Sequence, residues 1–187
     1  MAVELDSITH LLPIDGLELA TCAAGIRYAN RNDIVLISLD GASNTALIQT
    51  QNRFSAAPVQ IAARHFESAR PLALLINAGN ANAGTGQKGL DDALESCAMV
   101  AAAMELRPEQ VLPFSTGVIG EHLPIDRFSD AVPVLAKGLG KDHWVEAANA
   151  IMTTDTVAKG ESLQIKIDGE LVTLTGIVKG SGMIHPD

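Results

Sequence analysis

The sequence predicts an α/β fold of the layered α+β type, formed by a single domain over residues 1–187. Two observations favour this class. Strand-like segments gather at both ends of the chain and alternate with helices in the middle without a regular βαβ repeat. Hydrophobic residues make up 47% of the chain, which is enough to build a core and excludes intrinsic disorder.

The first half predicts strands followed by a helix and a buried strand. Three apolar segments lie close enough in sequence to pair antiparallel, and they occupy 17–26, 33–39 and 45–50. The segment 58–68 predicts a helix with a proline in its first turn. Residues 72–78 (LALLINA) form a continuous apolar run of the kind found in strands covered on both faces.

The middle of the chain alternates glycine-containing turns with regular elements. Residues 77–89 are rich in Gly, Asn and Ala and predict a loop with unusual backbone angles. A strong helix is expected over 90–106, and a short strand over 111–115. The segment 115–120 (STGVIG) predicts a turn after that strand.

The last third predicts two helices and a hairpin. Residues 124–137 and 142–152 have helical character. Residues 163–178 alternate apolar and polar side chains around an Asp-Gly pair, which is a strong signal for a two-residue hairpin turn.

Composition excludes several classes of partner. Thirteen Lys and Arg residues against 22 Asp and Glu residues give a net charge of −9, whereas nucleic acids and anionic membranes require a basic face. The N-terminus has no basic region followed by an apolar run, and no apolar stretch is long enough to span a bilayer. We therefore expect a cytoplasmic protein, in which Cys22 and Cys97 are buried thiols in a reducing compartment.

Short motifs considered singly favour structural roles. GTGQKG over 84–89 matches a dinucleotide fingerprint, but the preceding strand ends too early and the next strand ends in Ser115 rather than in an acidic residue. STGVIG could present a hydroxyl and a backbone N–H to an oxyanion, and the hydroxyl-rich run at 153–156 could hold a small polar ligand. The five histidines have no metal-binding spacing, so no metal site is expected.

Taken together, four segments resemble one family. NAGNANAGTG, PFSTGVIGEHLP, AIMTTDT and KGSGMIHPD occur in this order in the ornithine acetyltransferase (glutamate N-acetyltransferase) family. The resemblance spans residues 1–187 and implies the α chain of a self-cleaving precursor. It further implies an N-terminal-nucleophile-type fold shared between α and β chains, and two αβ units in an α2β2 heterotetramer. Cleavage is expected a few residues beyond Asp187, before a threonine that becomes the β-chain nucleophile.

The resemblance also implies roles for four residues. Thr116 and Gly117 match the family's oxyanion hole, with the Thr116 side chain and the Gly117 N–H facing the acetyl oxygen. Thr153 matches a substrate-binding threonine, although the neighbouring threonines leave the register open. Lys179 matches a lysine that pairs with the substrate α-carboxylate. NAGNANAGTG is interpreted as structural support for the oxyanion strand.

The implied reaction belongs to arginine biosynthesis. Acetyl passes from N2-acetylornithine to the threonine nucleophile and then to glutamate in a ping-pong sequence, with no metal and no bound cofactor; acetyl-CoA is a candidate co-substrate. Three alternatives stay open: an N-terminal-nucleophile aminopeptidase of related fold, a dinucleotide-binding domain that uses GTGQKG, and a non-catalytic subunit of a larger complex.

Overall fold

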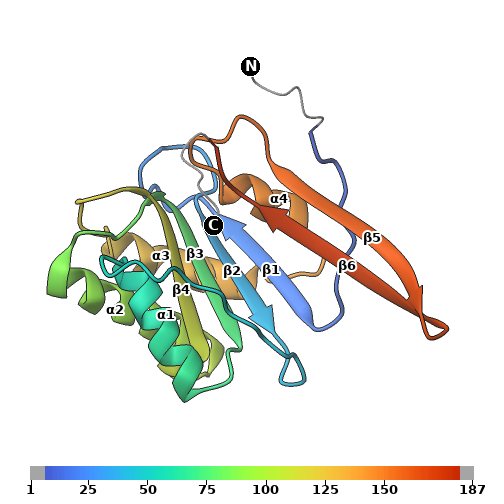
Figure 1. The fold of residues 1–187 in the computed structure, drawn as a ribbon. Coiled ribbons are helices and arrows are strands. Elements are labelled where there is room, and N and C mark those ends of the chain that lie inside the picture. The colour runs from blue at the N-terminus through green and yellow to red at the C-terminus, as the bar shows by residue number, and fades with distance from the viewer. Residues whose placement is uncertain (1–6, 182–187) are drawn as a thin grey trace.

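A computed structural model describes residues 7–181 of the chain, and its centre is a four-stranded mixed sheet (Figure 1). The strands are β1 (Leu17–Cys22), β2 (Ile34–Leu39), β3 (Ala73–Asn80) and β4 (Val111–Val118), in the spatial order β1-β2-β3-β4. The pairs β1–β2 and β2–β3 are antiparallel, and β3–β4 is parallel. The fold is therefore mixed α/β, as the sequence predicted.

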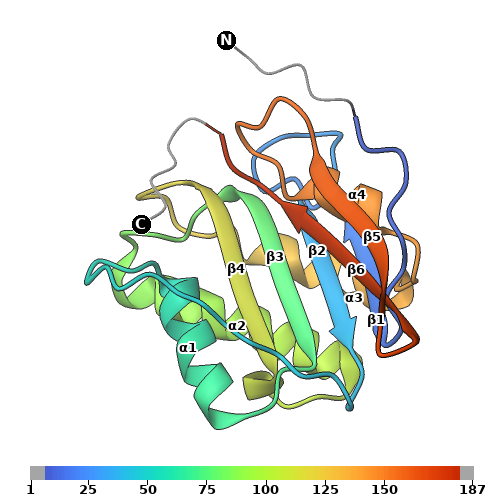
Figure 2. The same ribbon diagram turned by 45° about the vertical axis from the view of Figure 1, so that its right-hand side comes forward.

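Helices cover both faces of this sheet. On one face, α1 (Ala57–Ser68), α2 (Gly86–Met104) and α3 (Asp126–Lys137) pack on a core that includes Ile34, Leu36 and Leu75 (Figure 2). On the other face, Trp144 of α4 (Trp144–Ala150) packs with Leu19, Val35 and Ile37. Because β2 contributes to both cores, its apolar run is continuous rather than alternating. The 3-10 turn η1 (Pro108–Gln110) leads into β4.

The chain ends in a hairpin of β5 (Lys159–Ile167) and β6 (Glu170–Val178), which lies beside α4 and β1 (Figure 1). Asp168 and Gly169 both have positive φ, at 52° and 91°, as a two-residue primed turn requires. Ser162 donates to Thr175 or accepts from it at 2.9 Å, and the two hydroxyls bind the backbone of Leu12. The predicted hairpin is confirmed, and it begins four residues earlier than expected.

Two predictions in the first half are wrong. The strand predicted over 17–26 ends at Cys22, because the buried Asp33 carboxylate accepts hydrogen bonds from Ala24 N at 2.8 Å and Ile26 N at 2.6 Å and bends the chain away. The segment 45–50 is not a strand, because it runs along α1 rather than beside a sheet edge; the Gln49 amide donates to the Val59 carbonyl at 2.9 Å.

The glycine-rich middle is more regular than the sequence suggests. β3 continues to Asn80 and α2 begins at Gly86, so the loop predicted over 77–89 shrinks to 81–85. β4 likewise continues to Val118, so STGVIG is mostly strand rather than turn. Both extensions have one cause, since the two strand ends pair with each other through the register Gly79 to Gly117. β3, α2 and β4 thus form one βαβ unit.

Within residues 7–181, no helix combines the length and the apolar character needed to cross a membrane. The final segment MIHPD and Gly182, on which the expected cleavage chemistry depends, lie outside the described residues.

Candidate active site

One cavity brings together all four residues singled out from the sequence. Thr116, Gly117, Thr153 and Lys179 come from three separate segments, and all line a hollow of about 470 Å³. The hollow is lined by the carboxyl ends of the parallel strands β3 and β4, by the loop after α4 and by the segment after β6. Figure 2 shows the course of these two strands and of β6. The fold places these four residues close together, as an oxyanion hole and a substrate-binding site would require. The roles themselves stay predictions.

One side of the cavity is backbone from two strands. We call it the β3–β4 wall and define it as Gly79, Thr116 and Gly117. Gly117 has φ 149°, and a Cβ added to it would overlap the backbone of Gly79 and Asn80. Gly79 has φ 111°, and a Cβ there would lie 2.9 Å from the Cβ of Arg27. Only glycine fits both positions, which explains why β3 and β4 each carry a glycine where the two strands approach each other.

Asparagine amides hold the β3–β4 wall in place. The Asn77 side chain donates to the Asn80 carbonyl at 2.9 Å and accepts from the Ser115 hydroxyl at 2.6 Å, which ties β3 to β4 one residue before Thr116. The Asn80 amide donates to the carbonyls of Glu121 and His122, at 3.2 Å and 3.0 Å. The segment NAGNANAGTG is expected to support the oxyanion strand. These contacts show how it can do so, because its buried amides bind backbone groups near the ends of both strands.

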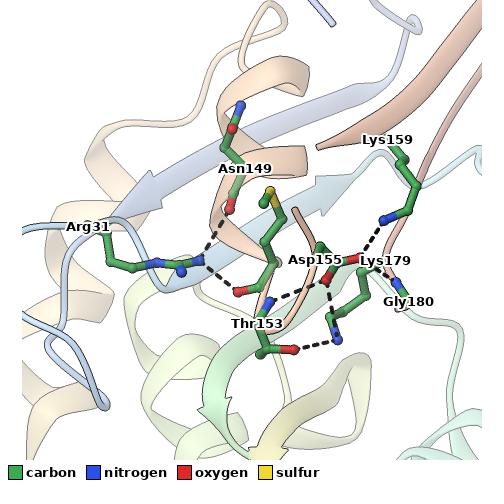
Figure 3. A network of polar contacts seen from close by, with 8 residues as sticks. Arg31, Asn149, Thr153, Asp155, Lys159, Lys179 and Gly180 are labelled. Atoms are coloured by element: carbon green, nitrogen blue, oxygen red, sulfur yellow. Dashed lines mark hydrogen bonds and ion pairs between the residues drawn. The ribbon is translucent and has the colours of Figure 1, made fainter. Parts of the chain in front are cut away.

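The opposite side of the cavity carries charge. We call it the lysine wall and define it as Thr153, Lys179 and Gly180 (Figure 3). The Lys179 ammonium donates to the Thr153 hydroxyl at 2.9 Å. Of the threonines at 153–156, Thr153 and Thr154 line the cavity, and the Lys179 contact favours Thr153 as the ligand-binding residue. Arg31 donates to the carbonyl of Met152 at 2.7 Å, which fixes the chain just before Thr153.

Asp155 is buried directly behind the lysine wall. Its carboxylate accepts from the Lys159 ammonium at 2.5 Å, from Gly180 N at 2.7 Å and from Thr153 N at 3.4 Å. Burial alone would raise the pKa of Asp155, but the hydrogen bonds from Lys159, Gly180 and Thr153 and the charge of Lys159 outweigh it and lower the pKa to about 2. The carboxylate is therefore ionised at neutral pH.

The cavity lining is cationic although the chain as a whole is acidic. Its charged residues among the described part of the chain are Arg27 and Lys179, with no carboxylate. Arg27 pairs with Glu121 at 2.9 Å at the rim, where both side chains are well exposed. Lys179 is only 21% exposed, so its charge is less screened than that of a surface lysine. The cavity thus suits a small ligand that carries a carboxylate.

Sequence reasoning missed several lining residues. Arg27 and Tyr28 follow β1 in a segment that reads only as a polar break, and no local signal places them at a site 90 residues away in sequence. Asp155 lies behind the lining and belongs to a run noted for its hydroxyls, but its burial and its contacts with Lys159, Gly180 and Thr153 depend on the folded chain. Gly79 and Gly180 complete the lining through their backbone.

The remaining sequence motifs have structural uses. The amide of Asn82 donates to the carbonyl of Gly89 at 2.8 Å, and a Cβ on Gly89 would overlap the Thr85 side chain, so GTGQKG serves the packing of its own loop. Burial raises the pKa of Cys97 to about 12, and burial with the charge of Asp33 raises the pKa of Cys22 to about 11, so neither thiol is a nucleophile at neutral pH. The part of the chain described here contains no cluster of His, Cys, Asp and Glu suited to a metal ion.

Comparison with known proteins decides the family. The model of the ArgJ family matches residues 18–187, which is most of the chain. The chain belongs to the ArgJ family. This confirms the resemblance that the four sequence segments indicated. The β3–β4 wall and the lysine wall both lie inside the matched range, so the whole candidate site is part of the ArgJ-family region.

Curated relatives carry the name arginine biosynthesis bifunctional protein ArgJ. The protein from Methylococcus capsulatus is 50% identical over 178 residues, covering 95% of this chain and 43% of that protein. The protein from Colwellia psychrerythraea is 42% identical over 200 residues, covering 100% of this chain and 47% of that protein. The chain therefore spans less than half the length of these ArgJ relatives.

Solved ArgJ-family structures share the fold. A crystal structure of arginine biosynthesis bifunctional protein ArgJ from Bacillus halodurans has a TM-score of 0.83 and 34% identity, covering 92% of this chain and 91% of the solved chain. The structure of ornithine acetyltransferase from Mycobacterium tuberculosis in complex with ornithine has a TM-score of 0.83 and 33% identity, covering 94% of this chain and 93% of the solved chain.

Proposed function

We propose that this chain is the α chain of an ornithine acetyltransferase that transfers acetyl from N2-acetylornithine to glutamate. In this proposal the β3–β4 wall supplies the oxyanion hole and the lysine wall binds the substrate α-carboxylate. The nucleophile is the N-terminal threonine of a β chain cut from the same precursor. The assembly is an α2β2 heterotetramer in the cytoplasm.

One observation carries the proposal. The charged residues that line the cavity are cations, and the other lining residues are neutral. One wall carries a lysine, and the other carries a threonine hydroxyl beside a glycine whose backbone is fixed by close packing. An N-acetylated amino acid has the two complementary features, a carboxylate and an amide carbonyl. The first pairs with an ammonium. The second needs hydrogen-bond donors when its oxygen becomes negative.

The first half-reaction follows from these roles. The threonine hydroxyl oxygen attacks the acetyl carbonyl carbon while the threonine's own α-amine accepts its proton. The Thr116 hydroxyl and the Gly117 N–H donate to the developing oxyanion, which stabilises the tetrahedral intermediate. The C–N bond then breaks, the proton passes to the departing amine, and ornithine leaves an acetyl-threonine ester behind.

The second half-reaction runs the same steps in reverse with a new amine. The α-amine of glutamate attacks the ester carbonyl, the same donors hold the oxyanion, and the threonine oxygen leaves with its proton restored. Lys179 and Thr153 bind the carboxylate of each substrate in turn, since both are α-amino acids. Acetyl-CoA is a candidate acetyl donor for the same ester, and no tightly bound cofactor takes part in this scheme.

The comparisons support this proposal in two ways. The solved ArgJ-family chains are covered to 91% and 93%, whereas the curated proteins are covered to less than half, as expected if the precursor is divided into two chains. The relative from Mycobacterium tuberculosis was solved with ornithine, the leaving product of the first half-reaction proposed here.

Isotope exchange tests the proposal. The protein is expressed from its complete coding sequence and incubated with N2-acetylornithine and labelled ornithine in the absence of glutamate. A ping-pong acetyl-enzyme predicts label in N2-acetylornithine without glutamate. Exchange that requires glutamate would contradict the acetyl-enzyme, and a complete absence of transfer would reject the proposed activity.

Product analysis separates the hydrolytic alternative. An aminopeptidase of related fold would release free amino acids from peptides and would leave glutamate unacetylated. Mass spectrometry of a parallel reaction that also contains glutamate and a peptide, together with the intact masses and N-terminal sequences of all chains, distinguishes the two. The proposed function predicts N-acetylglutamate and a second chain that begins with threonine.

A further inference from the structure

The buried carboxylate of Asp155 faces two ammonium groups at unequal distances (Figure 3). Its side chain has no exposed surface. The Lys159 ammonium lies 2.5 Å from one carboxylate oxygen, whereas the Lys179 ammonium lies 4.0 Å from the other. A buried carboxylate requires a compensating charge, and here the closer partner is Lys159.

The two lysines differ in what else they contact. Lys179 lines the cavity and donates to Thr153, whereas Lys159 is absent from the cavity lining and contacts Asp155 from behind. One negative charge can neutralise only one of the two ammonium groups. The pair with Lys159 therefore leaves the positive charge of Lys179 available to a ligand.

Asp155 also binds the backbone of both segments that form the lysine wall. One of its oxygens accepts from Gly180 N at 2.7 Å, and the other accepts from Thr153 N at 3.4 Å. The same carboxylate thus joins the loop after α4 to the segment after β6. These are the two segments that form the lysine wall.

We propose that Asp155 and Lys159 are positioning residues: together they hold the lysine wall in place, and Lys159 keeps the Lys179 ammonium available for the carboxylate of the amino-acid substrate by occupying Asp155. This inference rests on the proposed function. It concerns how the pocket selects carboxylate-bearing ligands, and neither residue touches the substrate or the reacting atoms.

Removal of the Lys159 charge tests the inference. In Lys159→Met, Asp155 loses its close partner, and Lys179 is drawn toward it and away from the substrate. We expect KM for N2-acetylornithine to rise about tenfold, because a hydrogen bond to a charged group is weakened, while kcat changes much less. Lys159→Arg keeps the charge, so its KM should stay within about twofold of the wild-type value.

A second substitution makes the test specific. In the Lys159→Met background, Asp155→Asn removes the charge that would capture Lys179, while the amide oxygen can still accept from Gly180 N. We expect KM to return toward the wild-type value in this double variant. If the two residues were only structural, the losses would instead add or grow.

Controls separate the possible failures. Lys166→Met lies on the same strand with an exposed side chain and should leave KM unchanged. KM does not depend on the folded fraction of the enzyme, and Lys159→Gln, which can still bind Asp155, replaces the methionine variant if that variant fails to fold. Active wild type with an unchanged KM in Lys159→Met would overturn this inference alone. Wild type without acetyl transfer would overturn the proposed function instead.

Discussion

The two walls of the cavity are built by opposite means. The β3–β4 wall is uncharged, and its shape comes from two glycines in close contact and from asparagine amides bound to backbone. The lysine wall is charged, and its shape comes from a buried carboxylate that joins two lysines and two backbone N–H groups.

This difference indicates what each wall can do. Fixed backbone close to a reacting carbonyl needs no reorganisation when charge develops, which is the property that lowers a barrier. A lysine on a flexible stem that pairs with the substrate carboxylate binds it equally in the ground state and in the transition state. Damage to the first wall should therefore be steric and independent of pH, and damage to the second should be electrostatic.

The largest effect is expected from Gly117→Ala. The added methyl group overlaps Gly79 and Asn80, and φ of 149° is strained for any other residue. The free energy of unfolding should fall by about 2–4 kcal/mol, and acetyl transfer should fall by more than ~10²-fold. Gly120→Ala is the matched control, because Gly120 also has positive φ, 83°, but open space around it. Equal behaviour of the two variants would show that close packing does not shape this wall.

Asn77→Ala should have a smaller effect on the same wall. The substitution leaves the Ser115 hydroxyl and the Asn80 carbonyl without their partner, which costs about 1–3 kcal/mol of unfolding free energy. Chemical denaturation measures the loss, and kcat should fall because β4 shifts at Thr116. Asn44→Ala, at an exposed site, should change neither quantity. Wild-type stability in Asn77→Ala would show that the asparagine amides do not hold the β3–β4 wall in place.

The lysine wall should instead respond to pH. The pKa of Asp155 is lowered to about 2 in the fold, so its stabilising contribution is fully present above its unfolded pKa near 4 and is lost as pH falls toward 2. Asp155→Asn should therefore be less stable than wild type by about 2 kcal/mol at neutral pH. Denaturation curves should converge between about pH 4 and pH 2. A difference that stays constant over that window would contradict the electrostatic origin of the stabilisation.

The local sequence pattern correctly predicted those elements whose conformation depends only on neighbouring residues. The hairpin turn at Asp168 and Gly169 needs only two residues with positive φ, and the sequence provides them. The end of β1 depends instead on Asp33, whose carboxylate binds backbone groups that the fold brings to it. The prediction of a strand over 45–50 was wrong for a similar reason, because a strand needs a sheet edge to pair with and this segment lies against α1.

The residues of the candidate site could be identified only from the family resemblance. Thr116, Thr153 and Lys179 lie on separate segments, and nothing in their local sequence indicates that they converge. Asp155 could not be identified as the centre of the lysine wall, because two of its partners, Lys179 and Gly180, lie more than 20 residues away in sequence. Motif order identified the family, whereas the distances that suggest a division of labour exist only in the folded chain.

Steady-state kinetics of Thr116→Ala and Lys179→Ala, measured side by side with N2-acetylornithine, test this division most directly. Thr116→Ala should lower kcat by roughly 10²–10³-fold with KM nearly unchanged, because an oxyanion donor acts in the transition state. Lys179→Ala should raise KM by roughly 10–100-fold and leave most of kcat, because a carboxylate anchor acts in binding. Near-normal turnover in Thr116→Ala, or an unchanged KM in Lys179→Ala, would contradict the assignment of the two walls.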